Sequence, residues 1–172
     1  MGRDKKNEQS SGHFTQLFRA TMETPAWRAL SATAQALYPW VKLEWKGPKA
    51  NNNGKISLSV RQAADRLGIT RDTANKAFQD LQAKGFLVIT ECGTLGSTGE
   101  AKAHLYEITE LPLPHGRERN GRRLFEKWDG NDFAVSKMRA NNPRGLNGKT
   151  ETQHETLDGE VTKIVSFRKG QS

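Results

Sequence analysis

The stretch from Ser57 to Ile108 constrains the fold of this chain more than any other. It opens with a capping box, since Ser59 is placed to accept a hydrogen bond from the Gln62 amide while the Gln62 side chain reaches back. The helix that follows ends at Gly68 in a tight turn, and Thr70 is placed to cap a second helix. The pattern therefore predicts two short helices joined by a turn.

The second predicted helix, residues 70–84, has one apolar side and one polar side. Its apolar residues recur at the i, i+3, i+4, i+7 spacing of a packed helix face, and Gly85 is the left-handed residue expected after its last turn. The apolar side consists of Ala74, Ala77, Phe78 and Leu81. The polar side, which packing leaves free, consists of Arg71, Asp72, Asn75, Lys76, Gln79 and Asp80.

Strand-like runs lie on both sides of the helix pair. Residues 86–90 and 104–109 are typical of two strands, and the glycine-rich loop between them is too long for a tight hairpin. Before the helix pair, residues 55–59 alternate apolar and polar side chains, as a short strand does. Further upstream, Pro25 begins one predicted helix and Ser31 caps the next, in which Pro39 is expected to kink or divide the helix.

This order of elements predicts an α+β fold, namely a winged helix-turn-helix domain whose wing is the loop at 91–103. Composition changes sharply outside that domain, where the flanking segments are polar and basic. The run VTKIVSF near the end is the one piece of the tail that looks ordered. The predicted divisions are a disordered N-terminus at 1–12, the domain at 13–113, a basic short helix or linker at 114–128, and a largely disordered C-terminal tail at 129–172.

Charge and cysteine content narrow the class of protein. The chain carries a formal net charge of +8 with a pI near 9.8, which suits a polyanionic partner. Cys92 is the single cysteine, so no internal disulfide is expected and a reducing compartment is favoured. The first residues lack the apolar core of a signal peptide, and no run has the length of a membrane span. A cytoplasmic, nucleoid-associated protein without a membrane segment is the expectation.

The sequence holds no recognisable catalytic constellation. Its four histidines are scattered, HExxH and CxxC motifs are absent, and one cysteine cannot build a thiolate zinc cluster. The glycine-rich stretch GTLGSTGE lacks the GK[ST] ending of a phosphate-binding loop. We therefore expect no enzyme activity, no cofactor and no metal.

The polar side of helix 70–84 carries side chains of the types that contact base edges in duplex DNA. Arg71 can form two hydrogen bonds with guanine in the major groove, and Asn75 or Gln79 can do so with adenine. Hydroxyls, helix-start amides and lysines suit phosphate oxygens. The candidate DNA-binding residues are Ser59, Arg61, Thr70, Arg71, Asp72, Thr73, Asn75, Lys76 and Gln79 in the helix pair and Thr94, Ser97 and Lys102 in the wing.

The domain itself does not carry the excess positive charge. Residues 59–111 contain six Lys or Arg and seven Asp or Glu, a net charge of 6 − 7 = −1. The flanks must therefore supply much of the attraction to phosphates. The flanking candidates are Lys42, Lys46, Lys49, Lys55, Arg117, Arg119, Arg122 and Arg123.

The segment GITRDTANKAFQDLQAKGFLV resembles the recognition helix and first wing strand of GntR- and MarR-type winged-helix regulators. The family's pattern positions are held here by Gly68, Thr70, Arg71, Thr73, Ala74, Ala77, Leu81 and Gly85. The pieces TPAWRALS, NNNGKISLS and YEITELP look like small winged-helix proteins carried by bacterial phages, plasmids and integrative elements. The resemblance implies that Arg71, Thr73 and Asn75 face DNA. The chain departs from those regulators in having no effector domain and no evident long dimerisation helix.

The resemblance and the residues together favour a small transcriptional regulator that binds double-stranded DNA sequence-specifically. Two alternatives stay open: a replication or partition factor of a plasmid or phage, and a winged-helix adaptor that binds a host protein. A homodimer and a protein partner for the C-terminal tail also stay open at this point.

Overall fold

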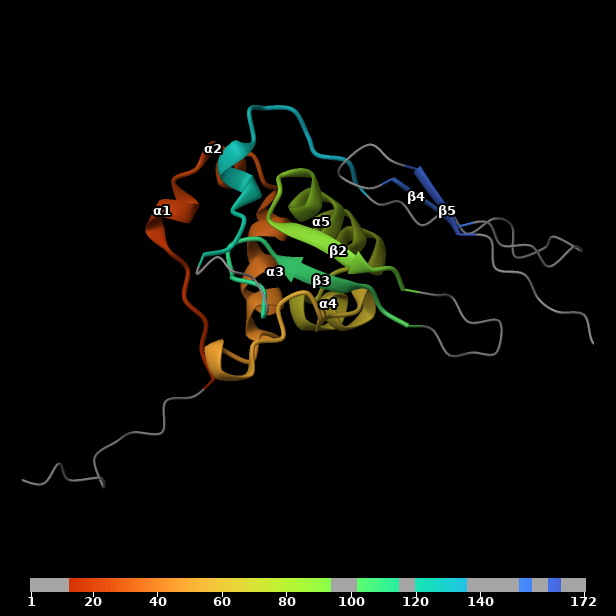
Figure 1. Ribbon diagram of the computed structural model, residues 1–172, viewed down its shortest axis with the longest axis horizontal. Helices are drawn as coiled ribbons and strands as arrows, with labels where there is room; N and C mark the ends of the chain where they lie inside the picture. The colour runs from red at the N-terminus through yellow and green to blue at the C-terminus, as the bar shows by residue number, and fades with distance from the viewer. Residues whose placement is uncertain (1–12, 94–101, 115–119, 136–151, 156–160, 165–172) are drawn as a thin grey trace, which may run out of the picture.

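The chain folds into an α+β arrangement of helices packed on a small antiparallel sheet (Figure 1). The computed structural model describes residues 13–93, 102–114, 120–135, 152–155 and 161–164, and every structural statement below concerns these residues. The helices are α1 (Arg19–Met22), α2 (Pro25–Arg28), α3 (Ala32–Leu43), α4 (Val60–Leu67) and α5 (Arg71–Ala83), with 3-10 turns η2 (Pro48–Ala50) and η3 (Leu124–Lys127). The strands are β1 (Ile56–Ser57), β2 (Leu87–Glu91), β3 (Leu105–Ile108), β4 (Thr152–Glu155) and β5 (Val161–Ile164).

The three-stranded sheet has the order β1-β3-β2, so β3 lies in the centre although it comes last in the sequence. Both pairs are antiparallel, with Ile56 opposite Tyr106 and Leu87 opposite Ile108. The ladder between β2 and β3 is irregular between Ile89 and Glu91, where the register shifts. The predicted short strand before the helix pair and the two strands after it are confirmed.

Local capping explains where the helices begin and end. The Ser59 hydroxyl accepts from the Gln62 amide and the Gln62 side chain accepts from the Ser59 amide, so the predicted capping box is present. The Thr70 hydroxyl accepts from the Thr73 amide at the start of α5. Gly68 is left-handed, with φ 64°, which lets the chain turn from α4 into α5.

Helix α3 runs through Pro39 without being divided, so one of the two outcomes expected for that proline is wrong. Proline removes an amide hydrogen bond and crowds the preceding turn, at a cost of about 3 kcal/mol. The side chains of Leu37, Tyr38 and Val41 on this helix are fully buried. Each such burial contributes roughly 1.5–3 kcal/mol, so packing offsets the local cost.

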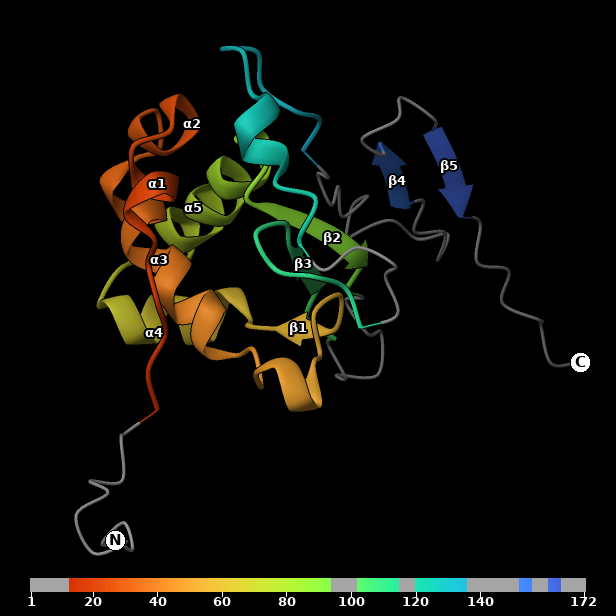
Figure 2. The same cartoon turned by 60° about the vertical axis from the view of Figure 1, so that its left-hand side comes forward.

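The core is built around a cluster of aromatic rings. Trp27, Tyr38 and Phe86 meet edge to face with ring centroids 5.3–5.7 Å apart. Phe86 also stacks on Phe125 at 4.7 Å, and η3, which carries Phe125, lies beside α2 (Figure 2). These rings bring the N-terminal helices, the start of β2 and the segment after the sheet into one core.

The core extends past residue 113, where the sequence placed the end of the domain. Phe125 is fully buried, and the Phe133 amide donates to the carbonyl of Ala83 at 2.8 Å. Residues 120–128 of the segment predicted as a basic helix or linker therefore pack on the domain, because the side chain of Phe125 completes the core. The predicted tail is also not structureless throughout, since β4 and β5 pair antiparallel with Thr152 opposite Ile164.

Across the part of the chain that the structure describes, no helix has both the length and the apolar character that crossing a membrane requires.

Candidate nucleic-acid interface

The apolar side of α5 is packed as the sequence predicts. Ala74, Ala77, Phe78 and Leu81 are all buried, and α5 contacts α3, α4 and β2. Phe78 stacks on Tyr106 of β3 with ring centroids 5.2 Å apart. The helix is therefore fixed from behind by small residues that allow close approach to the neighbouring helices and by one ring held on the sheet.

On its solvent side α5 carries a row of three polar residues, Arg71, Asn75 and Gln79, spaced four residues apart. Arg71 and Asn75 are exposed and Gln79 is half-buried. Within the described ranges none of the three side chains forms a hydrogen bond or an ion pair. Residues at i, i+4 and i+8 lie along one stripe of a helix, so these three donors and acceptors point to the same side. We call them the unpaired row.

A second row on α5 is occupied by ion pairs. Lys76 Nζ lies 2.8 Å from Asp72 Oδ2, and the hydrogen bond and charge of Asp72 raise the pKa of Lys76. Asp80 accepts from the amide of Ser31 at 2.8 Å, which ties α5 to the first residue of the α3 cap. Lys84 lies 3.7 Å from Asp80 and 2.5 Å from the carboxylate of Asp132. Asp80, which the sequence placed on the free side, is therefore a packing contact and not an available group.

The two threonines at the start of α5 that are predicted to contact phosphate have local partners. The Thr70 hydroxyl caps the helix and lies 2.8 Å from the Thr73 hydroxyl. Both hydroxyls are therefore already hydrogen-bonded within the first turn of α5, which leaves them less available to a phosphate oxygen. The helix start still presents amides of the first turn, which have no intrahelical acceptor.

The pairing of β1 with β3 brings the start of α4 and the base of the wing to the same end of the sheet. Ser57 is opposite Leu105, so the chain leaves β1 toward Ser59 and Arg61 where it enters β3 from Lys102. Lys102 is exposed, and so is the Arg61 side chain, whose Nε lies 4.0 Å from Asp65 Oδ2, too far for a hydrogen bond. Ser59 is half-buried in its capping box, so it offers less to a partner than the two cations do.

The wing loop is described only at its base. Gly93 is buried, and a Cβ added there would lie 2.3 Å from the carbonyl oxygen of Lys102, so the two arms of the loop approach as closely as glycine allows. The Gly93 amide donates to Nδ1 of His104 at 3.1 Å. Thr94 and Ser97, two predicted phosphate contacts, lie outside the described residues.

Three of the flanking cations offered for phosphate binding are used within the protein, which corrects their predicted role. Arg122 donates to both oxygens of the buried Glu107 carboxylate, at 2.9 and 2.6 Å. Arg123 pairs with Glu126 at 2.9 Å, and Lys42 is buried against Glu110. Burial of the Glu107 and Glu110 carboxylates demands a cation nearby, which fixes Arg122 and Lys42, whereas Arg123 and Glu126 form a partly exposed pair. Lys46, Lys49 and Lys55 are exposed, whereas Arg117 and Arg119 lie outside the described residues.

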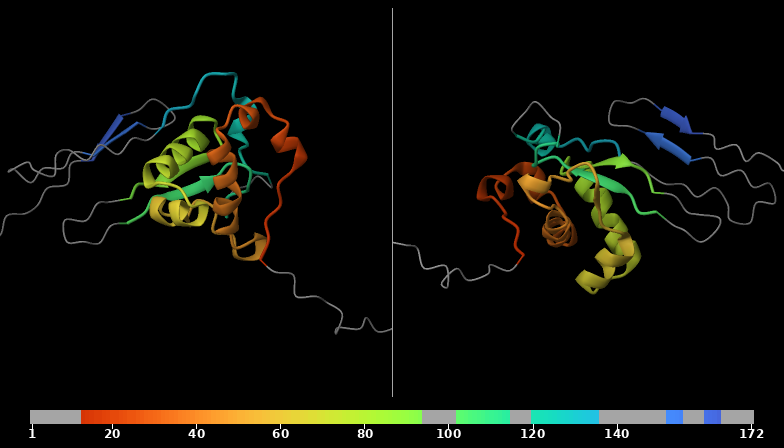
Figure 3. Two further views of the ribbon diagram at one scale, coloured as in Figure 1. Left: turned by 180° about the vertical axis from the view of Figure 1, so that it is seen from behind. Right: turned by 60° about the horizontal axis from the view of Figure 1, so that its bottom comes forward.

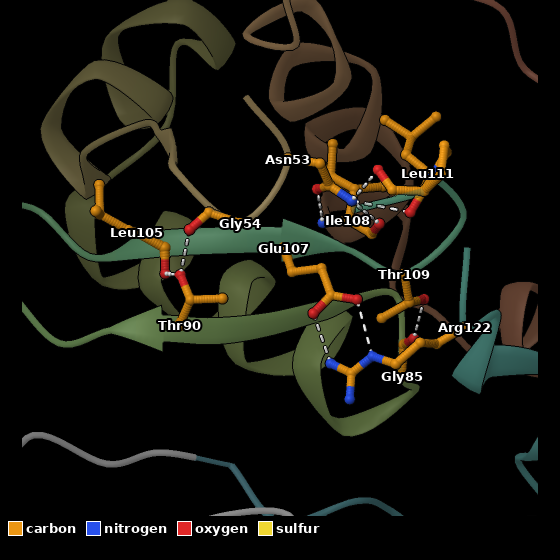
Figure 4. A network of polar contacts seen from close by, with 11 residues as sticks. Asn53, Gly54, Gly85, Thr90, Leu105, Glu107, Ile108, Thr109, Leu111 and Arg122 are labelled. Carbon is orange, nitrogen blue, oxygen red and sulfur yellow. Dashed lines mark hydrogen bonds and ion pairs between the residues drawn. The ribbon is translucent and has the colours of Figure 1, made fainter. Parts of the chain in front are cut away.

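Asn53 connects the loop before β1 to the end of β3, a role that the sequence did not indicate. Its side-chain nitrogen donates to the carbonyls of Ile108 at 3.0 Å and Leu111 at 2.9 Å, and its oxygen accepts from the Ile108 amide at 2.8 Å (Figure 4). The run of three asparagines predicts a turn, but nothing in it distinguishes the buried member. Asn53 makes these buried hydrogen bonds because the fold places its loop beside the end of β3.

A buried polar cluster joins α1 to α3. Glu110 accepts from Lys42 Nζ at 2.5 Å, from Tyr38 OH at 3.0 Å and from Thr21 Oγ1 at 2.5 Å. Burial, and then the charge and hydrogen bond of Glu110, hold the pKa of Tyr38 well above its usual value. The charged groups of this cluster are satisfied by one another, so they hold the scaffold behind α5 in place.

Among the residues the structure describes, no three His, Cys, Asp or Glu side chains are grouped as a metal site would need. Comparison of the chain with protein-family models, with curated proteins and with solved structures gave no match.

Proposed function

We propose that this chain is a winged helix-turn-helix protein that binds duplex DNA sequence-specifically, with α5 in the major groove. The observation that carries the proposal is the unpaired row of Arg71, Asn75 and Gln79 on the outer side of a helix that is packed on its other side. Arginine, asparagine and glutamine are the side chains that form bidentate hydrogen bonds with guanine and adenine edges. Their donors and acceptors are not consumed by the described part of the protein.

The dimensions of α5 suit a major groove. Arg71 and Gln79 are eight residues apart, which corresponds to about 12 Å along a helix axis. Stacked base pairs rise about 3.4 Å each, so the unpaired row spans roughly three to four base pairs. A helix with its side chains is about 10–12 Å wide, and the groove is about 12 Å wide.

Cations near the helix pair support a contact with the phosphate backbone. Arg61 at the start of α4 and Lys102 at the base of the wing are both exposed and come to the same end of the sheet. Lys76 lies beside the unpaired row, although its ammonium is shared with Asp72. These contacts would set the position and orientation of the protein on the duplex, and the unpaired row would select the sequence.

Such a DNA contact is compatible with a transcriptional regulator and equally with a replication or partition factor. The experiment that tests DNA binding itself is selection of bound duplexes from a random pool by the full chain, read out as enriched sequences. Enrichment of a short site containing guanine and adenine at fixed spacing is expected. Failure to retain any duplex even at about 50 mM salt, where phosphate contacts are strongest, would remove the proposal. Mapping of the selected site in the source genome then separates promoters from a repeated array at an origin.

A further inference from the structure

A cavity of about 530 Å³ lies between the N-terminal arm, residues 13–18, and the end of α3 with the loop that follows it. This is within the usual range for pockets that bind small ligands or the anchoring side chains of a peptide. Its walls are mainly apolar. The residues that line it include Phe14, Phe18, Trp45, Lys46, Pro48 and Leu111.

The cavity is held open by polar contacts behind it. Lys42 Nζ donates to the carbonyl of Gln16 at 2.7 Å, and the same ammonium lies 5.5 Å from the centroid of the Phe18 ring. Trp45 Nε1 donates to Asn51 at 2.9 Å, so its one polar group is satisfied and its ring remains as an apolar wall. Because these contacts already fix the arm, little conformational entropy of the arm would be lost when a partner binds.

The rings of the arm are unusually accessible for their size. Phe14 is 66% exposed and Phe18 is 52% exposed, and both line the cavity. Apolar area in contact with water is unfavourable by about 25 cal/mol per Å², and a concave apolar surface with projecting aromatic residues is typical of an interaction site.

The charges of the residues that line the cavity indicate what kind of molecule could bind there. Among the residues that the structure describes, the titratable ones lining the cavity are His13, Lys42 and Lys46, and none of them is an acid. Lys42 is neutralised by Glu110, whereas the Lys46 ammonium has no partner within the described ranges. A second copy would bring two basic rims together, and residues 165–172 of this chain add two cations and no acid. The acid-flanked Leu157 of this chain falls in the short connection between the paired strands β4 and β5 and is not part of a free terminal segment. A negatively charged ligand is therefore favoured over a second copy of the chain and over residues 165–172.

We propose that this cavity binds a short segment of another protein, in which a large aliphatic or aromatic side chain is flanked by acidic residues. The anchor would pack between Phe14, Phe18 and Trp45, and an acid would pair with Lys46. In Figures 1 and 3 the arm lies on the opposite side of α3 from α4 and α5. A partner bound there leaves the unpaired row accessible, and the inference stands whether or not the chain binds DNA.

The test is selection of peptides from a displayed random dodecamer library on the full chain, followed by calorimetric titration of the enriched peptide. Two substitutions at the cavity, Phe14→Ser and Lys46→Glu, are compared with two matched controls. Leu17→Ser changes an exposed apolar residue of the same arm that does not line the cavity, and Lys49→Glu changes an exposed lysine of the adjoining loop.

Enriched peptides with an apolar anchor beside acids, and a loss of at least about tenfold in affinity for each cavity variant but less than about twofold for each control, are expected. Peptides without acids would overturn the proposal, as would equal losses in the control variants. An absence of enriched peptides would also overturn it. So would self-association of the chain that Phe14→Ser abolishes, because a second copy would then be the occupant.

Discussion

The carboxylate of Asp72 lies 2.8 Å from the ammonium of Lys76 on the exposed side of α5, directly beside Arg71 and Asn75. This pair cancels charge at the place where the proposed interface meets phosphates. Because both side chains are largely exposed, the pair adds little to stability and acts mainly on the local potential. An anion that approaches α5 therefore competes with Asp72 for Lys76.

The variant Asp72→Asn is expected to strengthen binding to all duplexes, because it frees Lys76 for a phosphate and removes a repulsive charge. The slope of log affinity against log salt should steepen by about one. Filter-binding titrations at several salt concentrations measure this directly, and Glu23→Gln, which breaks an exposed pair with Arg19 in α1, is the matched control. Weaker binding by Asp72→Asn would mean that Asp72 itself contacts a base.

Removal of the unpaired row should relax sequence choice. Arg71→Ala and Asn75→Ala are each expected to lower discrimination between the selected site and a mutated site by about 1–3 kcal/mol. Competition titrations with single-base variants of the selected site give that number. Arg28→Ala, an exposed arginine on α2, should leave discrimination unchanged. If Arg71→Ala and Asn75→Ala altered neither affinity nor site choice, α5 would not be the helix in the groove.

Lys102 should contribute to binding without contributing to specificity. Lys102→Ala is expected to weaken binding to selected and unrelated duplexes by the same factor and to reduce the salt slope by about one, because a single phosphate contact is lost. Lys127→Ala removes an exposed lysine of η3 and is the control. A loss confined to the selected site would reassign Lys102 to base contact.

The Lys42–Glu110 pair makes a prediction about stability. Both side chains are buried, so Lys42→Met leaves the carboxylate without its cation and should lower the free energy of unfolding by about 3–5 kcal/mol. Adding Glu110→Gln should recover much of the loss, since the amide oxygen still accepts from one of the Tyr38 and Thr21 hydroxyls and the amide nitrogen can donate to the other, without a buried charge. Urea denaturation of the two variants decides the matter, and equal instability of both would show that shape, not charge, governs the site.

Tyr38 predicts loss of stability in alkaline solution. Its pKa is raised in the folded protein by burial and by Glu110, so the folded state keeps a proton that the unfolded state releases above pH 10, its ordinary value. The stability contribution is complete below pH 10 and is lost as the pH rises further. Tyr38→Phe should therefore make the decline between pH 9 and 11 shallower in urea titrations. An unchanged slope would assign the decline to other groups, among them Tyr106, whose pKa burial also raises.

Local pattern was sufficient for the elements that form the candidate site. The caps at Ser59 and Thr70, the left-handed residues at Gly68 and Gly85, and the apolar spacing of α5 depend on contacts within a few residues. For this reason the predicted helix at 70–84 coincides with α5 and its cap residues.

What local pattern could not decide is which charges the protein uses for itself. Lys42 and Glu110 are 68 residues apart, and Arg122 reaches Glu107 from a segment that the sequence had assigned to a linker. On α5 the sequence showed six polar residues alike, and only the tertiary structure showed that Asp80 is occupied by the amide of Ser31, the cap residue of α3. The tertiary structure made this distinction because a buried charge takes the nearest partner in space, and nearness in space is set by the whole fold.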